Sequence, residues 1–197
     1  FTRRINRYGQ RATELCARWK QEWGPERDRV ICVMGGMSAN SWVSEQALQC
    51  PLWAAENGGH ACAEHMDALA IAPYFGNHLG SPENASVVAG WTAQDDGGLS
   101  LLFQELAQGE VLNRSSNLAL PAVFAQINRH RVLADRYGLA LLAYEGGQHL
   151  VGVGAAQNDR RLEALFTAAN RDPRMGGLYT DYLAGWRRQG GQLFMLF

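Results

Sequence analysis

The sequence predicts an α/β fold in which parallel strands alternate with helices. Short apolar segments that stop at glycine or proline alternate with longer segments of helical periodicity, which is typical of a parallel sheet whose strands are joined by helices. The 197 residues are enough for one domain with a sizeable core. Four such strands can form a small open sheet or one half of an eight-stranded TIM (β/α)8 barrel.

The first helix and the first strand are expected near the N-terminus. Residues 4–23 have helical periodicity, and the segment WGPERD ends this helix. Its apolar face is formed by Ile5, Tyr8, Ala12, Leu15, Trp19 and Trp23. Residues 29–36, RVICVMGG, form a buried strand that stops at two glycines. A helix over residues 38–50 follows, with Ser38 as its N-cap.

The second strand is followed by a long excursion. Residues 67–76, DALAIAPYFG, form the strand, and residues 77–98 have the composition of a loop. Helices are expected over residues 99–112 and 117–137, and Gly138 stops the second of them.

The third and fourth strands complete the pattern. Residues 139–147, LALLAYEGG, form the third strand, and a capped helix over residues 158–172 follows it. A further helix over residues 176–191 leads to the fourth strand, residues 192–197. The chain thus begins inside a helix and ends inside a strand, so we expect it to be incomplete at both ends.

The charge balance narrows the classes of partner. The net charge is -1, without a basic run, which argues against a nucleic acid or an anionic membrane as the partner. A neutral or small partner is expected. The longest apolar runs fall far short of the roughly 20 residues that span a bilayer, so no transmembrane helix is expected.

The four cysteines lie in two kinds of sequence context. Cys16 lies in a helical pattern and Cys32 in an apolar strand, where buried free thiols are common. Cys50 and Cys62 flank a loop-like stretch and could close a small ring if the protein is exported. The first residues lack an initiator Met and could follow a removed segment, and we expect a secreted or periplasmic protein rather than a cytoplasmic one.

The segment HACAEH contains residue types that bind zinc. A zinc site would use His60, Cys62 and His65, with Cys50 as a fourth ligand. The spacing fits no standard zinc module, and the segment leads into the amino end of a strand. We therefore expect no metal.

The candidate catalytic residues are those at the carboxyl ends of the predicted strands. In parallel α/β proteins functional residues collect there, because the loops at these ends vary while the core is constant. Glu145 directly follows the run LALLAY, and two glycines behind it leave space for a ligand. A solvated glutamate that starts a turn is the alternative. Tyr74 ends the previous strand, where its phenol could hydrogen-bond a carboxylate or act as an aromatic plug.

Other strand-end side chains suit sugar hydroxyls or sugar rings. His78 and His149 are polar groups of this kind, although a lone loop histidine more often has a structural role. Trp42 and Trp91 are possible platforms for a ligand.

Four segments together resemble a known enzyme family. RVICVMGGMSANSWVSEQAL, DALAIAPYFG, LLAYEGGQHL and GGQLFMLF resemble strands 5 to 8 of a retaining glycoside hydrolase barrel, from the clan with catalytic glutamates after strands 4 and 7. The resemblance covers essentially the whole chain. It implies that residues 1–197 are a single (β/α)4 portion of a TIM-barrel catalytic domain.

The resemblance also implies an activity. Glu145 matches the nucleophile, and Tyr74 matches an aromatic residue that often supports it. Retaining hydrolysis needs two carboxyl groups about 5 to 5.5 Å apart. The clan's acid/base lies in an Asn-Glu pair that ends strand 4, and this chain has no such pair before its first strand. A segment or chain with the N-terminal half-barrel is therefore expected to supply it.

The expected function is hydrolysis of a β-linked oligo- or polysaccharide by double displacement, without a cofactor. The candidates for binding the substrate are Asn77, His78, Gln148, His149, Trp42 and Trp91. One alternative is a non-catalytic carbohydrate-binding protein on a degenerate barrel, which would need no second carboxyl group. Another is a small open-sheet α/β enzyme that is complete in itself.

Overall fold

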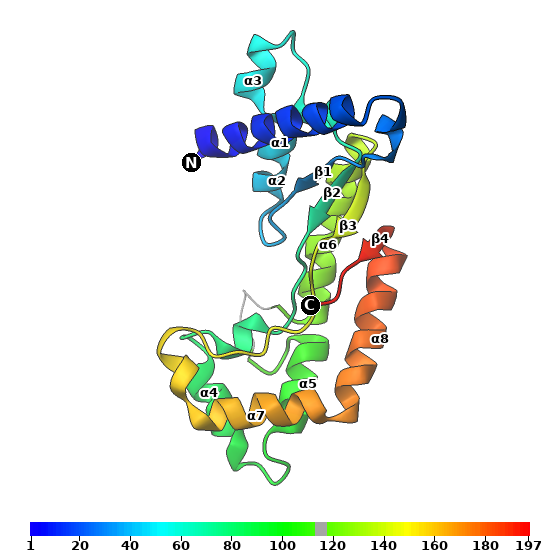
Figure 1. Cartoon of the computed structure of the whole chain (residues 1–197). Helices are drawn as coiled ribbons and strands as arrows, with labels where there is room; N and C mark the ends of the chain where they lie inside the picture. Colours follow the sequence, from blue (N-terminus) through cyan, green and yellow to red (C-terminus); the bar gives the residue numbers. More distant parts are fainter. Residues whose placement is uncertain (113–117) are drawn as a thin grey trace. The chain divides into compact units, whose positions relative to one another are not determined.

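The chain folds into two compact units, each with its own buried core. The computed structural model describes residues 1–112 and 118–197 (Figure 1). Unit 1 is formed by Phe1–Pro73, Gln126–Glu145 and Gln189–Met195. Unit 2 is formed by Tyr74–Ala125, Gly146–Arg188 and Leu196–Phe197.

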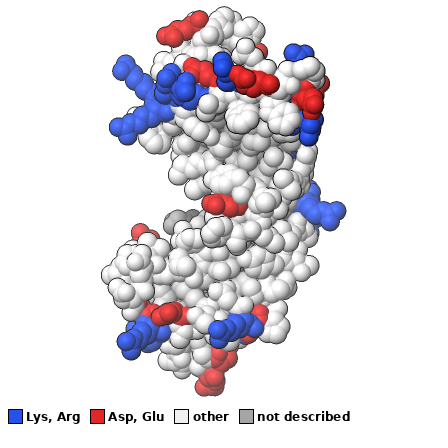
Figure 2. Space-filling model, in the orientation of Figure 1, with Lys and Arg blue, Asp and Glu red and all other residues white. Residues whose placement is uncertain are grey.

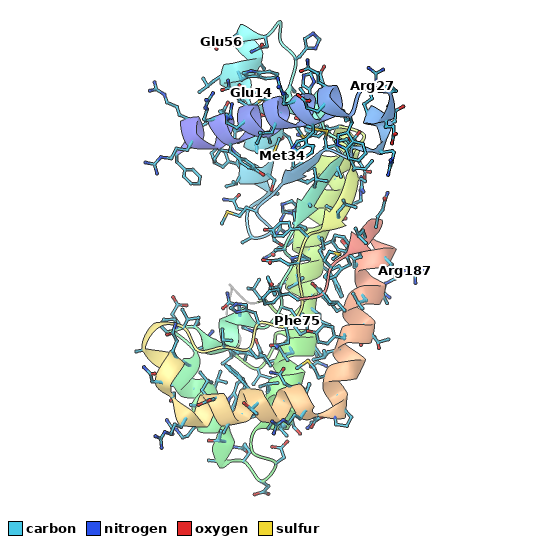
Figure 3. The ribbon with its side chains drawn as sticks, in the orientation of Figure 1. Glu14, Arg27, Met34, Glu56, Phe75 and Arg187 are labelled. Atoms are coloured by element: carbon cyan, nitrogen blue, oxygen red, sulfur yellow. A yellow bond between two sulfur atoms is a disulfide. The ribbon has the colours of Figure 1, made fainter. Side chains whose placement is uncertain are left out.

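Unit 1 contains a four-stranded parallel sheet. Its strands are β1 (Val33–Gly35), β2 (Ala68–Ile71), β3 (Ala140–Ala143) and β4 (Gly191–Phe194), and they lie side by side in chain order. All four residues of β2, one of the two inner strands, are buried, as expected for a parallel strand covered on both faces. Met34 of β1, labelled in Figure 3, is also fully buried.

Unit 1 also contains several helices. In chain order, those of unit 1 are α1 (Thr2–Trp23), the 3-10 helix η1 (Gly24–Arg29), α2 (Ser41–Gln49), α3 (Pro51–Glu56), η2 (Cys62–His65) and part of α6 (Leu120–Arg136). The predicted cap of α2 was wrong. Asn40 rather than Ser38 is the N-cap, and its side-chain oxygen accepts a hydrogen bond from the Trp42 N–H at 3.1 Å.

The face that α1 buries differs from the predicted one. Its buried residues are Ile5, Asn6, Gly9 and Thr13, whereas the apolar side chains of Tyr8, Leu15, Trp19 and Trp23 are 39–60% exposed. Gly9 explains why this face is the buried one, because a Cβ at Gly9 would overlap the carbonyl oxygen of Ala47 in α2. The two helices thus approach closely along the face that carries the glycine, which turns the larger side chains outward.

Charged residues of both signs lie on α1. Figure 2 shows them together over this helix, where Arg11 pairs with Glu14 and Arg18 with Glu22. Such exposed pairs contribute little to stability.

Two disulfides cross-link unit 1. Cys16 of α1 is bonded to Cys32, which lies just before β1, so the prediction of two free thiols was wrong. The second bond joins Cys50 and Cys62 and closes a ring around α3. Sequence could not pair Cys16 with Cys32, because their Cα atoms come to 5.8 Å only when α1 packs beside β1.

Unit 2 is mainly helical. It contains η3 (Asn77–Gly80), α4 (Ala85–Gly90), η4 (Trp91–Ala93), α5 (Leu99–Gln108), the start of α6, η5 (Gly154–Asn158), α7 (Arg160–Arg171) and α8 (Pro173–Arg188). Residues 77–98, expected as a loop, therefore include three short helices. The expected capped helix is confirmed, because the Asp159 carboxylate accepts hydrogen bonds from the first N–H groups of α7.

Aromatic rings form part of the core of unit 2. Phe75, labelled in Figure 3, is fully buried. Its ring lies 5.6 Å from that of Tyr179 and 5.0 Å from that of Tyr182, both on α8. Burial raises the pKa of Tyr182 far above its ordinary value, with the neighbouring Tyr179 and Tyr74 adding to the shift.

The prediction of half a TIM barrel was wrong. Among the described residues the fold is mixed α/β with four parallel strands, but 62% of these residues are helical and each strand has only three or four residues. The segment between β2 and β3 is not one crossover helix, since much of it belongs to unit 2. An apolar run extends as a strand only where a neighbour pairs with it, and β1 pairs with β2 over three residues alone.

None of the helices in the described ranges is long and apolar enough to cross a membrane.

Candidate functional site

Glu145 lies at the carboxyl edge of the sheet in unit 1. It is the second residue after β3 and is half-buried. The N–H of Tyr144 donates to the carbonyl of Ile71 at 3.1 Å, which holds the end of β3 against the end of β2. Among the described residues, no hydrogen bond or ion pair engages the Glu145 carboxylate. The backbone thus positions the carboxylate, and its oxygens remain available.

Two tyrosines belong to the same edge. Tyr144 is half exposed. Its pKa is raised, first by burial and then by the charges of Glu145 and Tyr8. The Tyr8 hydroxyl donates to the Gly35 carbonyl at 3.1 Å and accepts the Gly35 N–H at 2.9 Å. Tyr8, Tyr144 and Glu145 form what we call the Glu145 cluster, and both phenols are neutral donors at neutral pH.

Sequence reasoning missed both tyrosines of this cluster. Tyr8 was assigned to the buried face of the first helix, and Tyr144 was counted as part of an apolar run. A tyrosine at the carboxyl end of a strand, next to a glutamate, was the signal that could have identified Tyr144.

A small cavity of about 220 Å³ adjoins the end of β1. Tyr8, Gly35, Gly36 and Ser44 are among its lining residues. A Cβ at Gly36 would overlap the Ser44 hydroxyl, so the glycine lets the chain pass close to α2.

A buried hydrogen-bond network supports this end of β1. The Ser44 hydroxyl accepts the Met37 N–H at 2.9 Å and donates to Nε2 of His130 at 3.0 Å. The Nδ1–H of His130 donates to the Gln126 carbonyl at 2.9 Å. Burial lowers the pKa of His130, outweighing its backbone hydrogen bonds. The neutral ring therefore ties the loop after β1 to α2 and α6.

In unit 2, the structure brings two of the predicted site residues together. The rings of Tyr74 and His149 meet edge to face at 5.5 Å, and the Tyr74 ring also meets that of Phe197 at 6.3 Å. The backbone explains the contact, because the His149 N–H donates to the Phe75 carbonyl at 2.7 Å. Tyr74 belongs to unit 2 and Glu145 to unit 1, and support of Glu145 by Tyr74 stays a prediction.

Gln148 forms hydrogen bonds through both its side chain and its backbone. Its side-chain oxygen accepts the Leu150 N–H at 2.6 Å, and its backbone N–H donates to the Tyr179 hydroxyl at 3.0 Å. A Cβ at Gly147 would overlap the same hydroxyl, and the φ of 151° at this residue also favours glycine. The two glycines after Glu145 therefore include one that a contact within unit 2 requires.

His78 is part of a buried pair with Glu105. Its Nε2–H donates to Oε1 of Glu105 at 2.9 Å, and its Nδ1 accepts the Leu118 N–H at 3.1 Å. Oε2 of Glu105 accepts the N–H groups of Val111 and Leu112 at 2.7 and 3.0 Å. Burial lowers the pKa of His78, and Glu105 opposes this shift. Both ring nitrogens of His78 are thus engaged, and Asn77 beside it is half-buried.

The two candidate tryptophans differ in exposure. Trp42 is 44% exposed in unit 1 and stacks on Phe1 with ring centroids 6.4 Å apart. Trp91 is buried in unit 2. Of the two, Trp42 has the more accessible ring. Binding of substrate by Asn77, His78, Gln148, His149, Trp42 and Trp91 stays a prediction.

The sulfurs considered for zinc are joined in the disulfide between Cys50 and Cys62. Within residues 1–112 and 118–197, no group of three or more His, Cys, Asp or Glu side chains is placed to hold a metal ion. Comparisons with known proteins found no matching family model, curated protein or solved structure.

Proposed function

We propose that the protein is part of a retaining glycosidase and that Glu145 is its nucleophile. The observation that carries the proposal is a half-buried carboxylate without an internal partner among the described residues, at the carboxyl edge of a parallel sheet. Ligands of open α/β sheets bind at this edge. The phenol of Tyr144 adds a hydrogen-bond donor for the hydroxyl groups of a sugar, whereas the Tyr8 O–H is already donated to the Gly35 carbonyl.

The reaction has two steps. In the first, an oxygen of Glu145 forms a bond to the anomeric carbon while the bond to the leaving oxygen breaks, and a general acid gives that oxygen a proton. In the second, water attacks the anomeric carbon, the former acid takes its proton, and the ester to Glu145 breaks.

The acid/base is assigned to a segment outside these 197 residues. In unit 1, residues 36–40, 72–73 and 195 follow the ends of β1, β2 and β4, and none of them has a carboxyl side chain. The two disulfides support a secreted or periplasmic location, because such bonds persist in oxidising compartments.

A mechanism-based label tests the nucleophile. A 2-deoxy-2-fluoroglycoside with a dinitrophenolate leaving group needs no acid to depart, so it should esterify Glu145 of the full-length protein and add one glycosyl mass. The Glu145→Gln variant should stay unlabelled. The matched control Glu56→Gln, at the exposed end of α3 (Figure 3), should label like the natural protein. Labelling that persists in Glu145→Gln would refute the assignment.

A non-catalytic carbohydrate-binding protein is the second candidate. The stacked pair of Phe1 and Trp42 favours it, since both rings are exposed and aromatic faces suit sugar rings. Saturable binding of an oligosaccharide that Trp42→Ala abolishes, in a protein that the fluoroglycoside does not label, would favour the binder over the enzyme.

A further inference from the structure

The small cavity beside the end of β1 lies wholly within unit 1 and has a volume of about 220 Å³. Its walls are α1, the end of β1 with the residue that follows it, and α2. The lining residues are Arg4, Ile5, Tyr8, Gly35, Gly36, Val43, Ser44 and Ala47. The cavity shares Tyr8 with the Glu145 cluster, but its other lining residues are different, and so is its chemistry.

The walls of this cavity are mainly apolar. Ile5 and Ala47 are buried, and Val43 is half-buried. The Tyr8 hydroxyl is bound to both backbone groups of Gly35, and the Ser44 hydroxyl is bound within the buried network that reaches His130. A polar group that enters would lose its hydrogen bonds to water without full replacement. The walls therefore favour a ligand with an apolar body.

Arg4 is the exception in the lining. Its side chain is exposed, and among the described residues no hydrogen bond or ion pair engages its guanidinium. Residues 1–13 contain four arginines and no acidic residue, and Figure 2 shows basic side chains gathered at this end of α1. Unbalanced positive charge beside an apolar cavity favours a ligand that also has a negative group.

The position of Arg4 and the size of the cavity define this ligand further. Arg4 and Tyr8 are four residues apart on α1, so they lie on the same face of the helix. An apolar cavity of about 150 Å³ holds a benzene molecule, and the larger volume here admits such a ring with one small substituent. A carboxylate suits Arg4, because a guanidinium can donate two parallel hydrogen bonds to its oxygens.

We propose that this cavity binds a small apolar carboxylate, with a body about the size of a benzene ring. The body packs against Ile5, Val43 and Ala47, and the carboxylate accepts hydrogen bonds from Arg4. The proposal does not rest on the glycosidase function, because it uses neither the Glu145 carboxylate nor a sugar.

Nuclear magnetic resonance of the full-length protein tests the proposal with three probes. Benzoate has the ring and the charge, benzyl alcohol has the ring alone, and acetate has the charge alone. Benzoate should shift the backbone N–H signals of Gly35 and Gly36 saturably and bind about tenfold more tightly than either of the others. Equal affinity for benzyl alcohol would refute the carboxylate, and equal affinity for acetate would refute the apolar body. The absence of a shift at both glycines with benzoate would overturn the proposal.

Two arginine variants test the role of Arg4. Arg4→Gln should weaken benzoate binding about tenfold and leave benzyl alcohol unaffected. Arg3→Gln is the matched control, since Arg3 is an exposed neighbour outside the lining, and it should keep the affinity for benzoate. An equal loss in both variants would assign the effect to the general charge of α1 and overturn the proposal.

Two further variants locate the site and separate it from the Glu145 cluster. Val43→Phe fills the cavity and should abolish benzoate binding, whereas unchanged binding would place the ligand elsewhere and contradict the proposal. If Val43→Phe does not fold, the comparison of Arg4→Gln with Arg3→Gln still decides. Glu145→Gln should abolish fluoroglycoside labelling and leave benzoate binding intact, so failure of one proposal is distinguishable from failure of the other.

Discussion

Nε2 of His130 lies 3.0 Å from the hydroxyl oxygen of Ser44, and both side chains are fully buried in unit 1. The pair resembles a nucleophile and its base only in chemistry, because neither residue has accessible surface. Its evident role is to connect the loop after β1 with α2 and α6.

Replacing Ser44 by alanine should destabilise unit 1 by about 1–3 kcal/mol, because it leaves the Met37 N–H and Nε2 of His130 buried without a partner. Urea denaturation measures the change. Ser86→Ala removes an exposed hydroxyl on α4 and serves as the control, with an expected effect near zero. Equal effects of the two substitutions would contradict the role of the network.

The free energy of unfolding should decrease as the pH drops below about 6.5, which is the ordinary pKa of histidine. Burial lowers the pKa of both His78 and His130 in the folded protein. Between 6.5 and the lowered values, the unfolded chain binds protons that the folded chain does not. Each histidine then reduces the free energy of unfolding by up to about 1.4 kcal/mol per pH unit.

Urea midpoints measured above and below pH 6.5 check this window. His130→Gln should be less stable at neutral pH, yet its stability should decline less steeply with acid. A decline as steep as that of the natural protein would exclude His130 as a source of the pH dependence.

Glu105→Gln should destabilise unit 2 by about 2–3 kcal/mol. The carboxylate accepts from His78, Val111 and Leu112, and a glutamine NH₂ group would oppose at least one of these donors. Thermal unfolding measures the loss. Glu163→Gln, at an exposed position on α7, is the matched control and should change the midpoint little.

Two glycine-to-alanine substitutions should have opposite signs. Gly9→Ala forces a methyl group into the Ala47 carbonyl and should destabilise the contact of α1 with α2 by about 1–3 kcal/mol. Gly176→Ala meets open space inside α8 and should stabilise by about 0.5–1 kcal/mol. Denaturant midpoints of the two variants, compared with the natural protein, test this contact; a stabilising Gly9→Ala would show that the helices do not pack closely there.

Much of the local structure could be predicted from the chain. The four strand segments, most of the helices and the left-handed stop at Gly138 agree with expectation, because apolar periodicity and turn residues act over a few neighbours. The sequence placed the end of the third strand well enough to put Glu145 within two residues of the end of β3. The same local signals made each predicted strand too long, since hydrogen bonding to a neighbouring strand decides where a strand ends.

Sequence by itself determined the kinds of element, their order and the parallel α/β class. Tertiary structure alone decided which face of α1 is buried, that Cys16 bonds to Cys32, and that Tyr8 and Tyr144 belong with Glu145. The physical reason is distance along the chain. Periodicity depends on residues a few positions apart. These contacts instead join segments that can lie more than a hundred residues apart in the sequence, and only the packing of the folded chain brings such segments together.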